Sequence, residues 1–390
     1  MKILHFGHVP LPKWHPYAGR ARQHPGKWVV NWAAAQRRAG MDVEICCLIH
    51  KAPKDFECEV DGVPVHFLRS LHPYRHYTFY AVDQLRMARF ARKFAPDLVV
   101  GHGTEDANGW AALRSGLPFC IVAQGLVARI VRRSPSPPTF DEFMIRAGER
   151  HVWRRTRFAI AVSDYVAREL AEDYPKLDIS RIPLTYAPEL AGPVDFGRKA
   201  ADAVAFVGTP TPNKGIGEIA EAFGILASRG VFPFLHIAGN GPENAPNREG
   251  ETLRRLRSVL GSRLVLHGKL PTEEVFGVLD GCGTIVAPSR EEMFGNQLVE
   301  GLMRGCRAVV TDDTALAENA RRFGNSIVVP QADVPALAEA IETSVSAGID
   351  QEKSAEARRN IREYMSPETV AAKSGKVFSE ILEKCNRKSR

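Results

Sequence analysis

Short apolar runs alternate with segments of helical length along almost the whole chain. In the first half these runs lie at residues 2–6, 43–49, 63–68, 97–100, 119–123 and 158–162. Between them, apolar residues recur at helical spacing. One such segment, PGKWVVNWAAAQRRAG, begins with Pro25 and Gly26 and stops at Gly40, as helices commonly do. This β-α alternation predicts a doubly wound parallel sheet with helices on both faces.

A second series of the same kind follows a stretch without periodicity. Residues 183–201 are rich in Pro, Gly and Ala, which is typical of an interdomain linker. Six further apolar runs come after it, at 203–208, 234–239, 263–268, 283–289, 307–312 and 326–330. The tail from about 331 to 386 has a helical pattern throughout.

The alternation therefore predicts an α/β protein with two Rossmann-like doubly wound domains facing one another across a cleft. We expect an acceptor-side domain at residues 1–190 and a donor domain at residues 191–367. The last helix, at about 368–390, is long enough to pack back on the first domain.

Composition places the chain among ordinary globular proteins. It has 390 residues, 44% hydrophobic and 25% charged, enough for two cores. No window approaches the roughly 18 uninterrupted apolar residues of a membrane span. Prolines and a tryptophan follow the first apolar run, so we interpret it as a buried strand and not a signal peptide. The seven cysteines have no metal-type spacing, which favours buried free thiols in a reducing cytosol over structural zinc.

The net charge of +7 is unevenly distributed. Residues 1–200 hold 29 Lys and Arg against 20 Asp and Glu, whereas the remainder holds 23 against 25. The basic half is consistent with an ordinary solvated surface. It is equally consistent with a face for an anionic partner, such as a membrane surface, a lipid-phosphate acceptor or an acidic glycan. Nucleic acid is disfavoured, because no binding module accompanies the charge.

Ligands of open α/β sheets bind beyond the carboxyl ends of the strands, so the loops there are the places to search. The loop after the run at 203–208 reads TPTPNKG, with Lys214 just before a predicted helix. It is neither a Walker A loop nor a G-x-G-x-x-G fingerprint. A lysine at a helix start can pair with a phosphate, although a solvated lysine fits the pattern equally well.

The stretch APSREEMFGNQLVEGLMRGCRAVVTDD, at 287–313, is a second such loop. Gly295, Asn296 and Gln297 would offer backbone N–H groups to a diphosphate at the start of a helix. Glu292 precedes that helix and Glu300 lies about one turn inside it. Carboxylates accept hydrogen bonds from the vicinal hydroxyls of a sugar or ribose. Taken alone, the pair fits better with acids that stabilise a helix start, worth about 0.3–1 kcal/mol.

The order of these motifs changes that balance. The segments AFVGTPTPNKGIGEIAEAF, FLHIAGNGPE, LVLHGKLPTEE and PSREEMFGNQLVEGLMRGCRAVV follow one another over residues 203–313. Together they resemble the donor domain of family-4 (group 1) retaining glycosyltransferases of GT-B fold, in which Glu292 and Glu300 would form the E-x7-E motif. The N-terminal half resembles the family more loosely, in PGKWVVNWAAAQRRAGMDVEICCL and APDLVVGHG.

The resemblance implies a role for each matching residue. Glu292 would bind the transferred sugar, Glu300 the ribose, and Lys214 the diphosphate. We predict Glu292, Lys214, His102 and Gln124 as catalytic residues. The implied nucleotide-sugar-binding residues are Gly26, Lys27, Gly208, Thr209, Lys214, Lys269, Leu270, Met293, Phe294, Gly295, Asn296, Gln297 and Glu300.

Three positions depart from the family pattern. Thr209 stands where the family has an arginine, so one diphosphate cation is missing; Lys27 and Arg290 are the candidates to replace it. Gln124 stands where the family often has a histidine that faces the reacting sugar. Glutamine is no base, but it can hydrogen-bond a sugar hydroxyl or an oxyanion. Pro25 replaces the first of two glycines.

A polar group follows the run at 97–100 on the expected acceptor side. His102, Glu105 and Asp106 lie in the sequence GHGTED. His102 could contact donor sugar or acceptor, and either carboxylate could do base work, although a single histidine is as often structural. His5 and His8, which flank the end of the first predicted strand, are weaker candidates.

These residues together predict a retaining, metal-independent hexosyl- or related glycosyltransferase. Its donor would be a nucleoside-diphosphate sugar, without a further cofactor, and its acceptor a glycan or lipid-linked hydroxyl in bacterial cell-surface polysaccharide or glycolipid synthesis. We expect a cytoplasmic protein, with peripheral contact to the inner face of the plasma membrane as an open question. The alternatives are a catalytically silent binding relative, a nucleotide-sugar epimerase or hydrolase, and, least favoured, a dinucleotide oxidoreductase.

Overall fold

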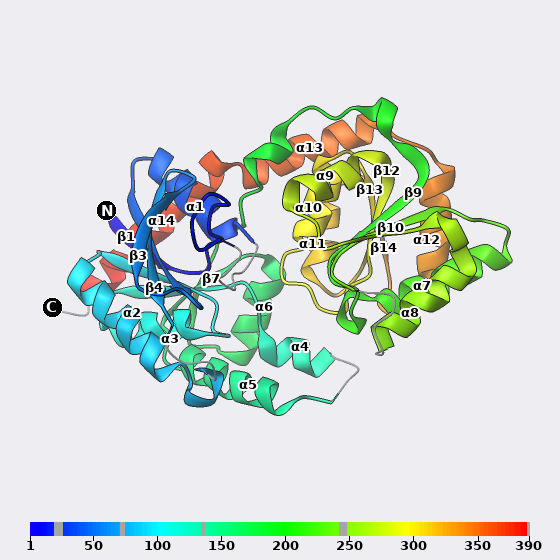
Figure 1. Cartoon of the computed structure of the whole chain (residues 1–390). Coiled ribbons are helices and arrows are strands. Elements are labelled where there is room, and N and C mark those ends of the chain that lie inside the picture. The colour runs from blue at the N-terminus through cyan, green and yellow to red at the C-terminus, as the bar shows by residue number, and fades with distance from the viewer. Residues whose placement is uncertain (19–25, 71–74, 134–136, 242–247, 388–390) are drawn as a thin grey trace. The chain divides into compact units, whose positions relative to one another are not determined.

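The computed structural model describes residues 1–18, 26–70, 75–133, 137–241 and 248–387, and its chain forms two compact units (Figure 1). Unit 1 comprises Met1–Val131, Pro138–Ala187 and Tyr364–Arg390. Unit 2 comprises Arg132–Pro137 and Pro188–Glu363. The sequence predicted a domain boundary between residues 190 and 191, and the structure changes from unit 1 to unit 2 after Ala187. The chain returns to unit 1 at Tyr364.

Unit 1 is built around one sheet. Its strands are β1 (Lys2–Phe6), β2 (Asp42–Ile49), β3 (Phe56–Val60), β4 (Val63–Arg69), β5 (Leu98–His102), β6 (Phe119–Ala123), β7 (Phe158–Ala161) and β8 (Asp178–Arg181). Its helices are α1 (Trp28–Arg38), α2 (Ala81–Phe94), α3 (Ala107–Ser115), α4 (Val127–Arg133, which runs into unit 2), α5 (Phe140–Trp153), α6 (Asp164–Asp173) and α14 (Pro367–Asn386), with a 3-10 turn at Arg75–Thr78.

Within the described residues the sheet order is β3-β4-β2-β1-β5-β6-β7-β8. All neighbours are parallel except β3 and β4, which form an antiparallel pair at the edge. The edge strand β3 and the short strand β8 are additions to the strands that the sequence pattern predicted. Helix α14 packs on α1, where the indole Nε1 of Trp32 donates to Ser374 Oγ at 2.7 Å. The C-terminal helix thus belongs to the core of unit 1.

Unit 2 repeats the scheme with one smaller sheet. Its strands are β9 (Ala200–Val207), β10 (Phe234–Ala238), β11 (Leu264–Gly268), β12 (Cys282–Ala287), β13 (Arg307–Thr311) and β14 (Ser326–Val329). Its helices are α7 (Ile216–Ser228), α8 (Arg248–Leu260), α9 (Thr272–Gly281), α10 (Asn296–Met303), α11 (Ala315–Phe323), α12 (Val334–Ser346) and α13 (Gln351–Met365). Short 3-10 turns lie at Pro188–Ala191, Phe196–Arg198, Pro212–Lys214 and Gly261–Arg263.

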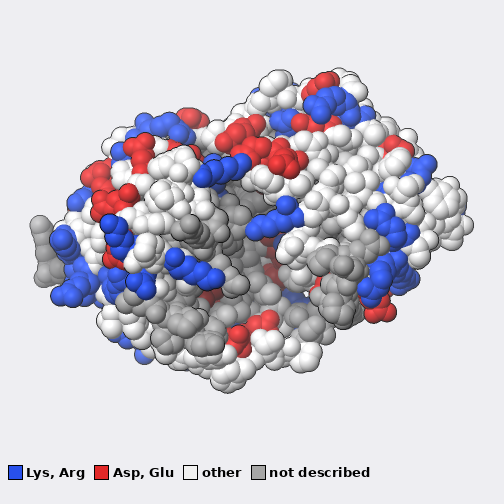
Figure 2. All heavy atoms as spheres, viewed as in Figure 1, with Lys and Arg blue, Asp and Glu red and all other residues white. Residues whose placement is uncertain are grey.

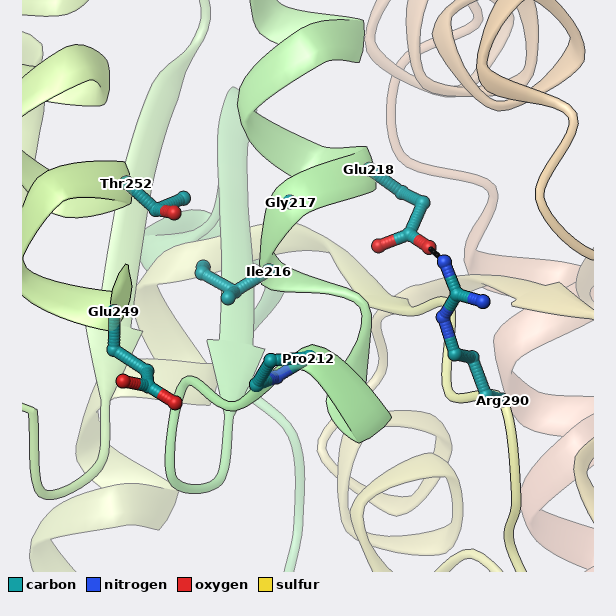
Figure 3. Close-up of a pocket in the computed structure, with 7 residues that line it drawn as sticks. All are labelled: Pro212, Ile216, Gly217, Glu218, Glu249, Thr252 and Arg290. Carbon is teal, nitrogen blue, oxygen red and sulfur yellow. Dashed lines mark hydrogen bonds and ion pairs between the residues drawn. The ribbon is translucent and has the colours of Figure 1, made fainter. Parts of the chain in front are cut away.

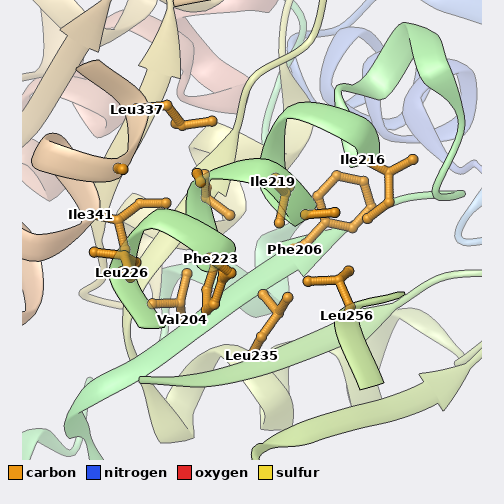
Figure 4. Close-up of a cluster of buried hydrophobic side chains, with 14 of the residues drawn as sticks. Val204, Phe206, Ile216, Ile219, Phe223, Leu226, Leu235, Leu256, Leu337 and Ile341 are labelled. Atoms are coloured by element: carbon orange, nitrogen blue, oxygen red, sulfur yellow. The ribbon is translucent and has the colours of Figure 1, made fainter. Parts of the chain in front are cut away.

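The described strands of this sheet run in the order β11-β10-β9-β12-β13-β14, all parallel. Every residue of β12 is buried, as expected for a strand with helices on both faces. Figure 4 shows part of the core, a cluster that includes Phe206 from β9, Phe223 from α7, and Leu337 and Ile341 from α12. This packing holds the strand ends, and hence the loops that follow them, in fixed positions.

Helix caps and close packing set where the functional loops end. Asp106 caps α3 by accepting from the Asn108 N–H at 2.9 Å. Gly301 brings α10 onto β12, because a Cβ there would lie 2.5 Å from Ile285 Cγ2. Among the described helices, none is long and apolar enough to cross a membrane.

Candidate functional site

The loop after β9 is folded against the loop after β12. Gly215 has φ +76°, and a Cβ on it would lie 2.2 Å from the carbonyl oxygen of Pro288, so only glycine fits there. The backbone N–H of Arg290 donates to the Asn213 carbonyl at 2.8 Å. These two contacts bring Lys214, at the end of one loop, to the residues that lead into α10.

Three polar side chains meet at that point. Lys214 Nζ lies 2.5 Å from Glu292 Oε2, and Gln297 Nε2 donates to the same oxygen at 3.0 Å. The side chains of Lys214 and Glu292 retain 30% and 16% of their exposure, so solvent or a ligand can reach the pair. Lys214 and Glu292, which the sequence analysis assigned separately to a diphosphate and a sugar, thus lie in contact in unit 2.

The start of α10 lies next to this pair. Gly295 caps the helix with φ +89°, and the first helical bonds run to its carbonyl from the N–H groups of Leu298 and Val299. The N–H groups of Asn296 and Gln297 come before the first helical bonds, so no carbonyl of the helix accepts from them, and they point out of its N-terminal end. The sequence predicted this helix start at Asn296, and α10 begins there.

Buried neighbours hold the loop before α10 in place. Met293 and Phe294 are 5% and 4% exposed. The Phe294 carbonyl accepts from Asn319 Nδ2 at 2.7 Å, and that of Glu292 accepts from the Ala315 N–H at 3.0 Å. The side chains of Met293 and Phe294 therefore anchor the loop, and any contact they make with a ligand would be through the backbone.

Glu300 lies one turn inside α10 and is half-buried. Burial raises the pKa of its carboxyl group to about 7, and no ion-pair partner for it occurs among the described residues. A carboxylate held in this way can gain hydrogen bonds from a ligand hydroxyl that the protein does not supply.

The two candidates for the missing cation are both engaged with carboxylates. Arg290 pairs through Nη2 with Glu218, on the first turn of α7. Lys27, in unit 1, pairs with Asp61 at 3.2 Å, and both side chains are largely exposed. Thr209 is exposed at the start of its loop. The described residues of unit 2 thus present Lys214 as the cation beside α10.

A small pocket of about 50 Å³ lies beside the Arg290–Glu218 pair (Figure 3). Its walls come from the Pro212–Lys214 turn, from α7 and α8, and from the loop after β12. They are formed by Pro212, Ile216, Gly217, Glu218, Glu249, Thr252 and Arg290. The pocket shares its loops with the Lys214–Glu292 pair but does not include that pair.

The remaining predicted residues of unit 2 lie at the ends of neighbouring strands. Gly208 ends β9 with φ +135°, and its N–H donates to the Ala238 carbonyl at 2.9 Å. Lys269 and Leu270 follow β11, the first exposed and the second half-buried. All of these strands run parallel, so their ends and the start of α10 share one edge of the sheet.

In unit 1 a hydrogen-bonded chain links β1, β5, β6 and α1. Trp28 Nε1 donates to Gln124 Oε1 at 2.8 Å, and Gln124 Nε2 lies 3.1 Å from His102 Nδ1. His102 Nε2 lies 2.8 Å from His5 Nδ1, and His5 Nε2 lies 2.9 Å from Gln36 Oε1. Burial lowers the pKa of His5 to about 4 and that of His102 well below its usual value.

Both ring nitrogens of His102 are hydrogen-bonded inside unit 1 and its side chain is buried, which favours the structural interpretation of this histidine. A direct role of His102 in ligand binding or catalysis stays a prediction. Gln124 is half-buried and stands at the end of β6. It is the member of the pair that can meet a ligand.

The carboxylates after β5 are also placed by local structure. Asp106 caps α3 and forms an ion pair with His8. Glu105 accepts from the Thr104 N–H at 2.8 Å. Burial, and to a lesser extent the neighbouring Asp106, raise the pKa of Glu105 to about 7. Glu105 can therefore exchange a proton near neutral pH, whereas Asp106 serves the helix.

Gly26 precedes α1, and Pro25 lies outside the described residues. A Cβ on Gly26 would lie 1.6 Å from Cζ3 of Trp28, so glycine is needed to make room for this indole ring. The structure thus gives a packing reason for the glycine that the resemblance had linked to phosphates.

Sequence reasoning missed Trp28, Gln36 and Glu218. The first two are far from their partners in the sequence, and nothing local marks them. Glu218 is an acid in the first turn of a helix, which is a common feature with many structural explanations. His5 was considered a weak candidate, yet it joins His102 to Gln36 in the hydrogen-bonded series of unit 1.

Comparisons with known proteins agree with these two units. The fold is GT-B: sucrose-phosphate synthase from Thermosynechococcus elongatus superposes with a TM-score of 0.77 at 17% identity, covering 98% of this chain and 100% of that one. Anabaena HepE in complex with UDP and glucose superposes with a TM-score of 0.69 at 15% identity, covering 97% and 100%.

Sequence comparison identifies the family. Residues 201–346 match the family model "Glycosyl transferases group 1", and residues 25–185 match "Glycosyl transferase 4-like domain". The chain belongs to the group 1 glycosyltransferases. The 2-deoxystreptamine N-acetyl-D-glucosaminyltransferase of Streptomyces fradiae is 25% identical over 286 residues. That alignment spans 66% of this chain and 65% of the relative.

Proposed function

We propose that this protein is a retaining glycosyltransferase that moves a sugar from a nucleoside-diphosphate sugar to a hydroxyl group. The observation that carries the proposal is the meeting of Lys214, Glu292 and Gln297 at the start of α10. A cation and helix N-terminal amides suit a diphosphate, while Glu292 and the half-buried Glu300 suit the hydroxyls on either side of it.

The proposed chemistry is mainly electrostatic. Negative charge develops on the diphosphate as the glycosidic bond breaks, and Lys214 with the N–H groups of Asn296 and Gln297 would stabilise it. The acceptor hydroxyl would attack the same face of the sugar, and the departing phosphate could take its proton. On this route Lys214 and the amides supply the positive potential, so we propose that the reaction is independent of a metal ion.

A related fold supports the class of donor. The Anabaena structure holds UDP and glucose, which are the parts of a nucleotide sugar. For this chain, Glu300 would bind the ribose, Glu292 the sugar, and the backbone of Lys269 and Leu270 the base. On the acceptor side, Glu105 has a pKa near 7 and would accept a hydrogen bond from the incoming hydroxyl.

Two acceptor classes follow from different observations. The basic excess of residues 1–200 supports a lipid-linked or acidic glycan of a bacterial cell surface. The Streptomyces fradiae relative is named for 2-deoxystreptamine, an aminocyclitol, which supports a small cationic acceptor. An acceptor panel should contain both classes.

The proposal is tested by donor binding followed by product analysis. We expect one or more of the UDP-, GDP-, ADP- and dTDP-sugars to raise the melting temperature, and transfer to an acceptor to preserve the anomeric configuration in an NMR spectrum. A chelator should leave the rate unchanged. Donor binding without turnover over the whole panel would instead indicate a binding-only relative. A changed sugar without an acceptor would indicate an epimerase, and free sugar a hydrolase.

We also propose peripheral contact between unit 1 and an anionic membrane. Among the described residues, seven of the eight exposed large hydrophobic side chains belong to unit 1, Phe140 and Phe143 on α5 among them. These two rings stack with 6.5 Å between centroids, and Phe140 stacks on Tyr77 at 5.9 Å. Figure 2 shows Lys and Arg interspersed with Asp and Glu on the face displayed. We therefore expect the exposed aromatic rings to contribute to membrane binding together with the basic charge.

Vesicle sedimentation checks this contact. Binding to phosphatidylglycerol vesicles should be measurable at low ionic strength and fall as salt is added, because the charge component is screened. The double variant Phe140→Ser/Phe143→Ser should bind less, whereas Phe232→Ser, which removes the exposed ring of unit 2, should bind like the wild type. Absence of binding at low ionic strength would contradict the proposal.

A further inference from the structure

The hydrogen-bonded series of side chains in unit 1 has a donor-to-acceptor direction that the structure allows us to determine. Its members are Trp28, Gln124, His102, His5 and Gln36, joined by four hydrogen bonds of 2.8 to 3.1 Å. Each bond needs one donor and one acceptor. The question is which atom of each pair carries the hydrogen, because this decides which groups Gln124 presents to a ligand.

Four of the five members leave that question open. A glutamine amide can be turned to exchange its oxygen and nitrogen, and a neutral histidine can carry its proton on either ring nitrogen. Gln36 does not fix the direction: in the orientation shown its Nε2 is buried without a partner. A turned amide would only exchange an unpaired N–H group for an unpaired oxygen.

Trp28 is the exception, because an indole N–H is a donor and never an acceptor. Its bond at 2.8 Å requires oxygen at that position of Gln124. The Gln124 nitrogen must then donate to His102 Nδ1, so the proton of His102 sits on Nε2 and is donated to His5 Nδ1. His5 in turn carries its proton on Nε2 and donates it to Gln36 Oε1.

We propose that Trp28 is a positioning residue, which fixes the direction of this chain and thereby holds Gln124 as a hydrogen-bond donor toward an oxygen atom of the ligand. The Gln124 oxygen is used by Trp28 and one N–H by His102. The second N–H has no partner among the described residues. The identity of the ligand rests on the proposed function, whereas the direction of the chain does not.

The surroundings agree with a chain of neutral groups. His5 and His102 are buried, and burial disfavours their protonated forms, as the lowered pKa values of both rings indicate. A Cβ on Gly26 would lie 1.6 Å from Cζ3 of Trp28, so glycine leaves room for the indole ring in this position. Gln124 therefore offers its second N–H group in a fixed orientation. A histidine at this position could change its tautomer and present an acceptor instead.

The direction can be measured on the protein without any substrate. Two-dimensional NMR of ¹⁵N-histidine distinguishes the two neutral tautomers, and we expect both His5 and His102 to carry the proton on Nε2. In Trp28→Phe the donor is lost, and a net hydrogen bond biases an equilibrium by about tenfold. The reversed tautomers should then become detectable at both histidines.

Trp32→Phe is the matched control. Trp32 lies on the same helix and its ring meets His5 and His102 edge-on, but its N–H donates to Ser374 outside the chain. This variant should keep the wild-type tautomers. The proposal is overturned if either wild-type histidine carries its proton on Nδ1, or if Trp28→Phe leaves both tautomers unchanged.

Binding measurements identify the ligand oxygen. Gln124→Glu keeps the shape of the side chain, but its ionised form offers no donor. Weaker binding of the nucleotide sugar without acceptor, by about tenfold or more, would place the oxygen on the donor substrate. Unchanged donor affinity with a raised KM for the acceptor would place it on the acceptor. If neither changes, Gln124 is not a donor to the ligand, even where transfer itself is intact.

Discussion

Lys214→Ala should lower the rate of sugar transfer by about 10²–10³-fold, the usual loss when one preorganised group that stabilises a developing negative charge is removed. Lys214 is the cation beside the start of α10 in the described part of unit 2, because Arg290 is paired with Glu218. At the position of the family's arginine stands Thr209, which is exposed and carries no charge.

The pairing of Lys214 with Glu292 makes the two variants distinguishable. At 2.5 Å, Glu292 competes with a phosphate for the ammonium group. Lys214→Ala should therefore weaken binding of the nucleoside diphosphate as well as transfer. Glu292→Ala should abolish transfer but preserve or tighten binding of the diphosphate, because it releases Lys214. If one variant binds the nucleoside diphosphate more weakly and the other binds it more tightly, a general loss of folding does not explain both results.

Calorimetric binding of nucleoside diphosphate and initial rates, measured on both single variants and the double variant, complete the test. A double-mutant cycle isolates the coupling of the pair. Lys214→Arg is the control that keeps the charge but changes its geometry, and it should fall between wild type and alanine. Wild-type activity in both Lys214→Ala and Glu292→Ala would show that the reaction occurs elsewhere.

The sequence predicted the strand ends, the loops and the helix start of this proposed donor site because these parts are local. Each strand end, loop and helix start lies within a few residues of the next, and Gly295 and Asn296 mark the start of α10 directly. The parallel strands then bring Lys214 and Glu292 together across 78 residues without further information, since both follow neighbouring strands β9 and β12.

The chain in unit 1 could not be predicted in the same way. Its four bonds join residues 22, 31, 96 and 97 positions apart, and they depend on the rotamers of the side chains involved. The edge strand β3, with the sequence FECEV, was missed for a related reason: only its pairing with β4 distinguishes it from a polar loop. Tertiary contacts, not local pattern, decide both features.

Replacing Glu300 should make the protein more stable and a weaker binder. Burial raises the pKa of its carboxyl group from 4.5 to about 7, which means that the folded protein holds the charged form at a cost. Between these pH values the folded state binds more protons than the unfolded state, so stability falls as pH rises. Below pH 4.5 the Glu300 carboxyl is neutral and costs no stability. Above its folded pKa of about 7 the full cost of holding the charged form is reached.

Glu300→Gln removes that titration. Relative to wild type, its free energy of unfolding should be unchanged at pH 4.5 and higher by about 1–3 kcal/mol at pH 8, the pKa shift discounted for a half-buried group. Urea denaturation at both pH values measures the difference. Glu221→Gln, on an exposed position of α7, is the matched control for loss of a carboxylate at the surface.

Nucleotide binding should change in the opposite direction. The ionised carboxylate accepts hydrogen bonds from ribose hydroxyls, and loss of a hydrogen bond to a charged group costs about 1.5–3 kcal/mol. Glu300→Ala should thus weaken nucleoside-diphosphate binding at pH 8 by tenfold or more. Wild-type binding also involves deprotonation of Glu300, so its affinity should rise more between pH 6 and pH 8 than that of the variant, in which only the terminal phosphate of the ligand titrates. A stabilised variant with unchanged affinity would assign Glu300 to the helix alone and leave the ribose without its proposed partner.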